Sequence, residues 1–373
     1  MQHALPKQEQ SGQQQSKRQQ KSRFFSPQLS RELRKATADL KKINPWFGLS
    51  RFVVLGSATV VLTVFTWEFS QGGERVGLLM LGAIATSIAY SFWLICNHDA
   101  THRTLTGWDW FDATMPRLIS WPMLLPIGTY NQVHSLHHGW NGIDLRDPER
   151  VQWTALEYAT APPWQRWYVR HQWAIDLLVF GSFGLIFKTL SRGIVLRDHL
   201  SDLSNQMVLD AIGIVCMQGA ILGCFLLYGG SLWTYLLFWI VLERGIGIIM
   251  QARDHLEHYG MWQQVGDYQL TQLYACRNVK TYAWVNWLMG GLPYHSVHHA
   301  FPHLASNHLP EAFSRIQTVL QQHHLPPMVV ASGYLASSLR LAGRPSVIAS
   351  DPVAENIDLT PSQSLQSIVL ACK

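Results

Sequence analysis

The sequence predicts an all-α membrane protein with four transmembrane helices in two hairpins and a helical cap on one membrane face. Charged residues make up only 14% of the 373-residue chain, whereas a typical soluble domain contains about 25%. The chain also contains 16 tryptophans, and an indole ring with one polar edge favours the boundary between water and lipid. The third observation is a set of long apolar runs that occur in pairs.

Four apolar runs approach the ~20 residues that a helix needs to cross the hydrocarbon core. They are residues 52–69, 76–96, 208–228 and 231–250. Only SQGGER separates the first two runs, and only GG separates the last two, so each pair predicts a helical hairpin. Glu243 and Arg244 lie towards the end of the fourth run. We expect them near its mouth or facing the bundle interior, because an unpaired charge facing lipid is costly.

Three histidine clusters lie close to the ends of these runs. His98 and His102 are four residues apart directly after the second run, so on a helix both face the same way and can hold one metal ion. The motifs HSLHH and YHSVHH each contain three histidines, which are His134, His137 and His138, and His295, His298 and His299. The spacing i, i+3, i+4 places each set within roughly 100° of one helix face.

Isolated HxxxH pairs are as often structural histidines as metal ligands, but three matched clusters near span ends favour a metal site. Eight imidazoles are too many for one tetrahedral zinc, so they suit two metals that share one basin. Neutral imidazole is a common ligand of iron, zinc and copper. The first cluster, HDATH, lacks the glutamate of the zinc-protease motif HEXXH. In RDHLEHYG, at 253–260, His255 or His258 can supply a ninth ligand.

The side of the membrane follows from the charge distribution. Residues 1–51 contain eleven Lys and Arg, whereas the two hairpin tips contain one and none. The positive-inside rule therefore places both termini and the histidine clusters in the cytosol. Residues 116–127 are too short and too rich in proline to span. If residues 173–187 crossed once, the second and third clusters would face opposite sides, so we expect an interfacial or re-entrant helix there.

The ends of the chain differ in composition from the apolar part. We divide the sequence into a polar N-terminal segment, 1–45, a membrane catalytic domain, 46–330, and a C-terminal tail, 331–373. Residues 1–22 are polar, rich in Gln and expected to be disordered. Residues 28–42 predict a basic amphipathic helix, either on an anionic membrane face or in solvent. The net charge of +5 is modest, and the basic residues are not interleaved with aromatics, which argues against nucleic-acid binding.

Together, the motifs resemble the integral-membrane fatty-acid desaturase and hydroxylase superfamily over roughly residues 50–325. In that family each conserved histidine motif is called a box, and HDATH, HSLHH and YHSVHH correspond to the first, second and third boxes. The last box is typically followed by Phe-Pro and then by Leu-Pro leading into an amphipathic helix. Here these dipeptides are Phe301-Pro302 and Leu309-Pro310. The EHYG sequence at 257–260 is similar to a box of membrane alkane monooxygenases in which the histidine is a ligand, which favours His258 over His255.

The resemblance implies a non-haem diiron centre in the cytosolic cap, with O2 as co-substrate and a long apolar lipid or acyl substrate. The implied ligands are His98, His102, His134, His137, His138, His258, His295, His298 and His299. Some relatives carry a fused cytochrome b5 with a His-Pro-Gly-Gly motif, which does not occur here. We therefore expect a separate electron donor that is similar to ferredoxin, rubredoxin or cytochrome b5.

Carboxylates near the boxes are candidates to accept the second N–H of a ligand histidine. Asp99 lies inside the first box, and Asp144 and Asp147 follow the second. Asp147 precedes a proline, so it can equally cap a helix or start a turn. Among the histidines outside the boxes, His255 and His303 are the remaining candidates for a place near the metals.

Three functions remain open at this point. The first is a fatty-acyl desaturase that forms a carbon–carbon double bond. The second is a hydroxylase or ketolase on the same fold that acts on an alkane, sterol-like or carotenoid substrate. The third is a non-catalytic metal-binding membrane protein such as a transporter. The third is disfavoured because transporters place ligands near the bilayer midplane, whereas these histidines lie at span ends.

Overall fold

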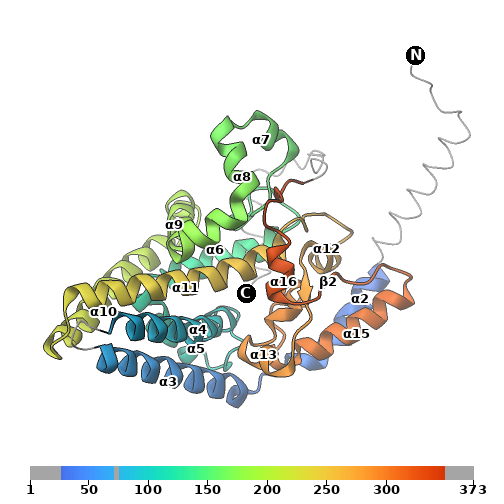
Figure 1. Ribbon diagram of the computed structural model, residues 1–373. Helices are drawn as coiled ribbons and strands as arrows, with labels where there is room; N and C mark the ends of the chain where they lie inside the picture. The colour runs from blue at the N-terminus through green and yellow to red at the C-terminus, as the bar shows by residue number, and fades with distance from the viewer. Residues whose placement is uncertain (1–26, 71–74, 349–373) are drawn as a thin grey trace, which may run out of the picture.

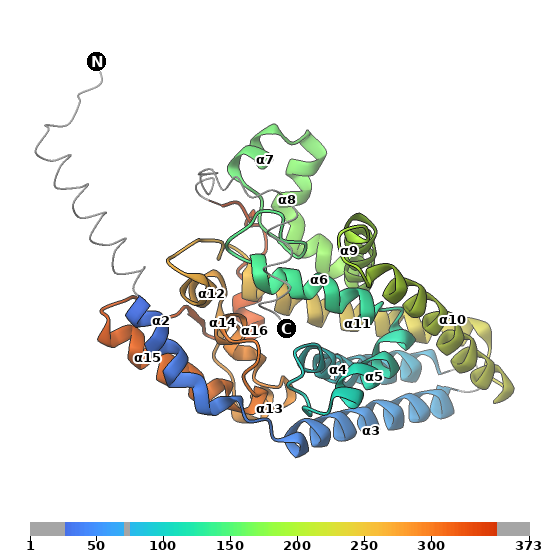
Figure 2. The same ribbon diagram turned by 180° about the vertical axis from the view of Figure 1, so that it is seen from behind.

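The structure is a computed structural model that describes residues 27–70 and 75–348. The predictions for residues 1–22, for most of the first hairpin tip and for the chain after residue 348 lie outside the described residues. The described part is mostly helical and is drawn in Figures 1 and 2. Long apolar helices occupy one end, and shorter elements with the histidine motifs occupy the other.

Four long helices match the four apolar runs. They are α3 (Pro45–Ser70), α4 (Val76–Thr101), α10 (Leu203–Leu227) and α11 (Leu232–His258). The first pair forms a hairpin, and α4 packs on both α3 and α11. Much of their surface exposes apolar side chains such as Val61, Phe65 and Val215, as expected of helices that face lipid. Glu243 is buried in α11 and forms an ion pair with Arg244 at 2.7 Å, so this charge faces the bundle interior.

A fifth apolar helix lies between the two hairpins. It consists of α8 (Pro163–Ile175), a π-helical turn η3 (Asp176–Phe180) and α9 (Gly181–Leu196). By length and composition the described residues contain five helices that can cross a membrane, one more than the sequence predicts. The additional helix is bent at Gly181, which has a φ of +54°. The Arg244 guanidinium donates to the carbonyls of Leu178, Val179 and Phe180 and so satisfies the backbone acceptors at the bend.

The helix predicted at 28–42 is covered by the protein itself. It forms α2 (Pro27–Thr37) followed by the 3-10 turn η1 (Ala38–Lys41). Leu29, Leu33 and Leu40 are buried in a core shared with α15 (Leu309–Gln322), and Figure 2 shows α2 and α15 side by side. Its apolar face is therefore on neither a membrane surface nor solvent, because the matching face of α15 buries it.

Short elements connect these helices and carry much of the site. The helices are α5 (Asp109–Ser120), α6 (Ile127–Trp140), α7 (Ala155–Thr160), α12 (Tyr268–Ala275), α13 (Ala283–Leu288), α14 (His295–Ala300) and α16 (Tyr334–Leu339). The 3-10 turns are η2 (Trp121–Met123), η4 (Leu292–Tyr294) and η5 (Ser306–His308). Strands β1 (Asn278–Val279) and β2 (Val330–Ala331) pair in parallel. Residues 116–127 are divided among α5, η2 and the start of α6, so they form no long helix.

Candidate metal centre

All nine histidines implied as ligands meet at one end of the bundle. The first box lies in the last turn of α4 and at its C-cap, the second in the C-terminal half of α6, and the third forms most of α14. His258 is the last residue of α11. All nine are buried except His102, which is half-buried. Four segments that are far apart in sequence therefore deliver their imidazoles to one buried region.

Within this region the donor atoms form two groups. Cluster A contains His98, His102, His134, His138 and His298. Cluster B contains His258, His295, His299 and Cys276. In each cluster one donor atom per residue lies within 4.8 Å of all the others. The clusters are adjacent, because the rings of His138 and His299 stack with centroids 4.1 Å apart.

His137 lies between the two clusters, and Asp147 contacts its Nδ1 edge. Its Nδ1 is 2.9 Å from each carboxylate oxygen of Asp147, so Nδ1 carries a proton and Nε2 is left to bind a metal. The His137 ring lies 4.8 Å from that of His258 and 4.9 Å from that of His299, which places it beside cluster B. Burial lowers the pKa of His137, but the carboxylates of Asp147 and Glu149 outweigh it and raise the pKa to about 9. A metal at Nε2 would displace this second proton.

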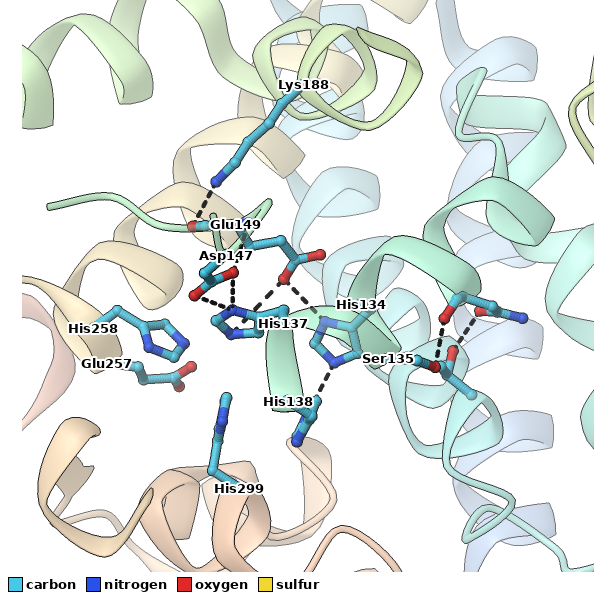
Figure 3. A network of polar contacts seen from close by, with 12 residues as sticks. His134, Ser135, His137, His138, Asp147, Glu149, Lys188, Glu257, His258 and His299 are labelled. Carbon is cyan, nitrogen blue, oxygen red and sulfur yellow. Dashed lines mark hydrogen bonds and ion pairs between the residues drawn. The ribbon is translucent and has the colours of Figure 1, made fainter. Parts of the chain in front are cut away.

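Glu149 performs the same task for cluster A. Its Oε2 lies 2.9 Å from Nδ1 of His134, and Lys188 donates to its backbone carbonyl at 2.8 Å. Figure 3 shows Asp147 and Glu149 on the side of the second box away from His299. Burial tends to raise the pKa of Glu149, but His134, His137 and Lys188 lower it below its usual value. The sequence analysis missed Glu149, although it lies only two residues after Asp147.

Further supporting groups come from outside the boxes. Oε2 of Glu257 lies 3.3 Å from Nδ1 of His295 and pairs with Arg253 at 2.6 Å. Gln272 Oε1 lies 3.2 Å from Nδ1 of His299. Sequence analysis missed these residues as well. Glu257 immediately precedes His258, whereas Gln272 has no distinctive spacing that would reveal it.

The other candidates are placed differently. Asp99 lies 3.8 Å from Nδ1 of His98 but pairs with Arg51 at 2.5 Å. Asp144 pairs with Arg146 and contacts no box histidine. His255 points away from both clusters, since its Nε2 lies 2.9 Å from Asp176 in a separate cleft. His303 is exposed on the surface beside the backbone of His102.

The family model of fatty acid desaturases matches residues 76–330. This chain belongs to the fatty acid desaturase family. It is 22% identical to a Delta(8)-fatty-acid desaturase of Euglena gracilis over 290 residues, which cover 71% of this chain and 69% of the relative. It is also 22% identical to a Delta 8-(E)-sphingolipid desaturase of Candida albicans over 273 residues, which cover 65% and 46%. A Delta(5) fatty acid desaturase of Caenorhabditis elegans is 24% identical over 292 residues, which cover 72% and 64%.

Membership in this family, together with the apolar helices, indicates a membrane-bound oxidoreductase that acts on lipids. The buried histidine clusters are compatible with a metal site. Several imidazole nitrogens are buried without any hydrogen-bond partner among the described residues, namely both nitrogens of His98 and Nε2 of His102, His298 and His299. Leaving a buried polar atom unsatisfied costs about 1–3 kcal/mol, and bound metal would remove that cost for each nitrogen that coordinates it.

The protonation of these histidines also suits metal binding. Burial, reinforced by the neighbouring imidazoles, lowers the pKa of His138, His298 and His299 well below its usual value. The three rings therefore remain neutral at physiological pH and keep a lone pair for a metal.

A narrow, mostly apolar cavity of about 120 Å³ reaches both clusters in this desaturase-family chain. Its apolar wall comes from α4, α6, α9 and α11 and includes Leu94, Ile127, Leu185, Ile246 and Met250. The same cavity is lined by His98 and His134 of cluster A, by His258 and His295 of cluster B, and by charged side chains that include Glu149, Lys188, Arg253 and Asp254. An apolar chain in this cavity would thus pass directly beside both histidine clusters.

Proposed function

We propose that this chain is an O2-dependent, non-haem diiron desaturase that introduces a double bond into the acyl chain of a lipid. The observation that carries the proposal is the pair of adjacent histidine clusters, members of which line one mostly apolar cavity. Family membership supports the reaction type. The relatives are named for fatty-acid and sphingolipid substrates, which supports a long acyl chain as the group that is oxidised.

The proposed reaction converts –CH2–CH2– into –CH=CH–. O2 accepts two hydrogen atoms from the substrate together with two electrons and two protons, and leaves as two molecules of water. When bound, the two irons would supply O2 activation, with His98, His102, His134, His138 and His298 holding one and His137, His258, His295 and His299 the other. The two external electrons require a separate donor, for which we propose a protein similar to ferredoxin, rubredoxin or cytochrome b5.

The protein residues provide orientation and exclude water. Asp147, Glu149 and Glu257 hold the Nδ1 edges of His137, His134 and His295, so that each Nε2 faces the centre. The apolar cavity wall brings the methylene groups to the metals and keeps bulk water from the site. The carboxylates therefore position ligands, while the aliphatic side chains position substrate.

We further propose that 46–330 is the catalytic domain and that its histidine end faces the cytosol. The positive-inside distribution of Lys and Arg supports this side. In this arrangement α3, α4, α10 and α11 cross the bilayer, and the helix Pro163–Leu196 does not. The stacking of His138 on His299 supports this arrangement. Three apolar helices, Pro163–Leu196, α10 and α11, lie between these two residues in the sequence. Three crossings would place them on opposite sides, whereas two crossings leave them together. In Figure 1, α8 also runs across the direction of α3 and α11.

Lipid profiling tests the proposed reaction. We would express the wild type, His298→Ala and His324→Asn in one host and analyse total lipids by mass spectrometry. His298 belongs to cluster A, whereas His324 is exposed and has a φ of +53°, a conformation that asparagine tolerates. Acyl species lighter by two hydrogens in the wild type and in His324→Asn, but not in His298→Ala, are the expected result. Species heavier by one oxygen would instead identify a hydroxylase.

A further inference from the structure

Helix α12 presents one side to the histidine region, although it contributes no ligand histidine. Tyr268 and Gln272 are four residues apart, and Cys276 follows four residues later as the C-cap, so the three side chains lie on one face. The face lies where the second and third boxes approach each other, and α12 packs against α14. A helix of this length therefore reaches several ligand-bearing segments at once.

Tyr268 and Gln272 connect the second box to the third. The Tyr268 hydroxyl lies 3.1 Å from the carbonyl of His138 and 3.0 Å from that of His299. Gln272 donates from Nε2 to the carbonyl of Asn141, the C-cap of α6, at 2.7 Å. Its Oε1 faces Nδ1 of His299 at 3.2 Å. Because Gln272 is fully buried, these partners fix its amide in one orientation.

Cys276 extends the same network to α11. Its Sγ accepts a hydrogen bond from Nδ2 of Asn141 at 3.1 Å and lies 3.8 Å from Nδ1 of His258. The opposite ring nitrogen of His258, Nε2, lies 2.9 Å from Nε2 of His295. The Nδ1 edge of His258 thus faces the sulfur, and the Nε2 edge faces the centre of cluster B.

We propose that α12 is a brace for the second metal site, in which Gln272 and Cys276 accept the Nδ1–H groups of His299 and His258. These contacts fix the tautomer and ring orientation, so that both Nε2 atoms face the metal. The proposal rests on the proposed metal centre. Gln272 and Cys276 act here as positioning residues, and they complement Asp147 on His137 and Glu257 on His295. A direct thiolate ligand is the competing role for Cys276, because its Sγ lies within the 4.8 Å group.

Metal titration of the purified full-length protein tests this brace. We would strip the protein of metal, titrate it with Co2+ and follow absorption and the number of ions bound per chain. The wild type should bind two ions without a thiolate-to-cobalt charge-transfer band. Gln272→Leu and Cys276→Ala should each weaken one of the two sites by about 10-fold or more, leaving the other unchanged. Cys276→Ser retains an acceptor and should bind nearly as the wild type does. Gln321→Leu, at an exposed position of α15, is the matched control.

The outcomes separate the brace from the proposed function. A wild type that binds neither Co2+ nor Fe2+ overturns the metal centre itself. Two sites of wild-type affinity in both Gln272→Leu and Cys276→Ala overturn the brace and leave the metal centre standing. A charge-transfer band that disappears in Cys276→Ser makes Cys276 a ligand and overturns its role as acceptor. The comparison of Cys276→Ser with Cys276→Ala remains informative if Gln272→Leu does not fold, because the two variants differ by a single hydroxyl.

Discussion

Arg51 forms a fully buried ion pair with Asp99, with Nη1 and Oδ2 2.5 Å apart. Arg51 lies in the second turn of α3, and Asp99 lies between the two histidines of the first box. A second guanidinium nitrogen donates to the carbonyl of Leu288 at 3.2 Å, shortly before the third box. One side chain therefore links the start of the first hairpin to the first histidine motif and to the segment that precedes the third.

Replacing Arg51 with methionine should destabilise the protein severely. The change leaves the Asp99 carboxylate buried without its partner, which costs about 3–5 kcal/mol when one member of a buried ion pair is removed. We expect a large decrease in the thermal midpoint of the protein in detergent, measured by tryptophan fluorescence. The double variant Arg51→Met with Asp99→Leu should recover part of the loss.

Arg146→Met is the control for this prediction. Arg146 also pairs with an aspartate, Asp144, at 2.6 Å, but its side chain is 53% exposed. Exposed pairs contribute about 0–1 kcal/mol, so the midpoint should hardly change. Equal midpoints for Arg51→Met and Arg146→Met would contradict the role given to Arg51.

The sequence predicted those features that repeat with a helical period. Runs of apolar residues located the four long helices, and the i, i+3, i+4 histidines located the buried centre. Contacts between distant segments have no such signature, so Arg51 and the α12 residues Gln272 and Cys276 escaped notice. The segment Pro163–Leu196 illustrates the same limit. Its hydropathy is similar to that of the other long helices, so only tertiary structure, chiefly the contact between His138 and His299, bears on whether it crosses the membrane.

Removing the charge of the Asp147 carboxylate, which contacts Nδ1 of His137, should weaken the metal centre. Asp147→Asn keeps the size of the side chain but replaces one acceptor oxygen with a donor, which disturbs the contacts of 2.9 Å to Nδ1. Loss of such a supporting group typically lowers metal affinity or activity by about 10–100-fold. Metal content and lipid desaturation should both fall. Asp144→Asn should match the wild type in both measurements, because Asp144 pairs with Arg146 outside the site.

Single ligand substitutions should remove the two metals separately. His298→Ala is expected to deplete cluster A, and His295→Ala cluster B, because the two residues belong to different donor groups. Each variant should retain about one iron per chain, against two in the wild type, measured by elemental analysis of purified protein. Both should lose activity, since the proposed reaction needs both metals. The exposed His303→Ala variant should keep both irons, and two irons in His295→Ala would contradict the assignment.

A bulky side chain in the cavity should block the substrate without disturbing the metals. Leu185 lines the cavity from α9, and Leu185→Trp would fill part of its 120 Å³. The indole would occupy space that the acyl chain needs, and forcing both into one cavity costs about 1–3 kcal/mol. We therefore expect turnover of long acyl chains to fall about 10-fold while iron content stays at the wild-type value. Leu190→Trp changes an exposed residue of the same helix and should leave turnover unchanged. Normal turnover in Leu185→Trp would show that the substrate takes another path.

Single-cysteine labelling should reveal whether the helix Pro163–Leu196 crosses the membrane. Exposed positions before and after this helix and at the second hairpin tip are available as Trp164→Cys, Asp198→Cys and Tyr228→Cys. Each is placed in a background in which the exposed Cys216 and Cys224, and Cys372 of the C-terminal tail, are serine. If the helix lies along the cytosolic face, an impermeant maleimide added to intact cells should label only Tyr228→Cys. Permeabilised cells should label all three. A complete crossing would reverse the labelling of the last two variants in intact cells. Asp198→Cys would then lie outside and be labelled, whereas Tyr228→Cys would lie inside and be protected. Trp164→Cys is cytosolic in both arrangements, so it reports whether the cells have stayed sealed.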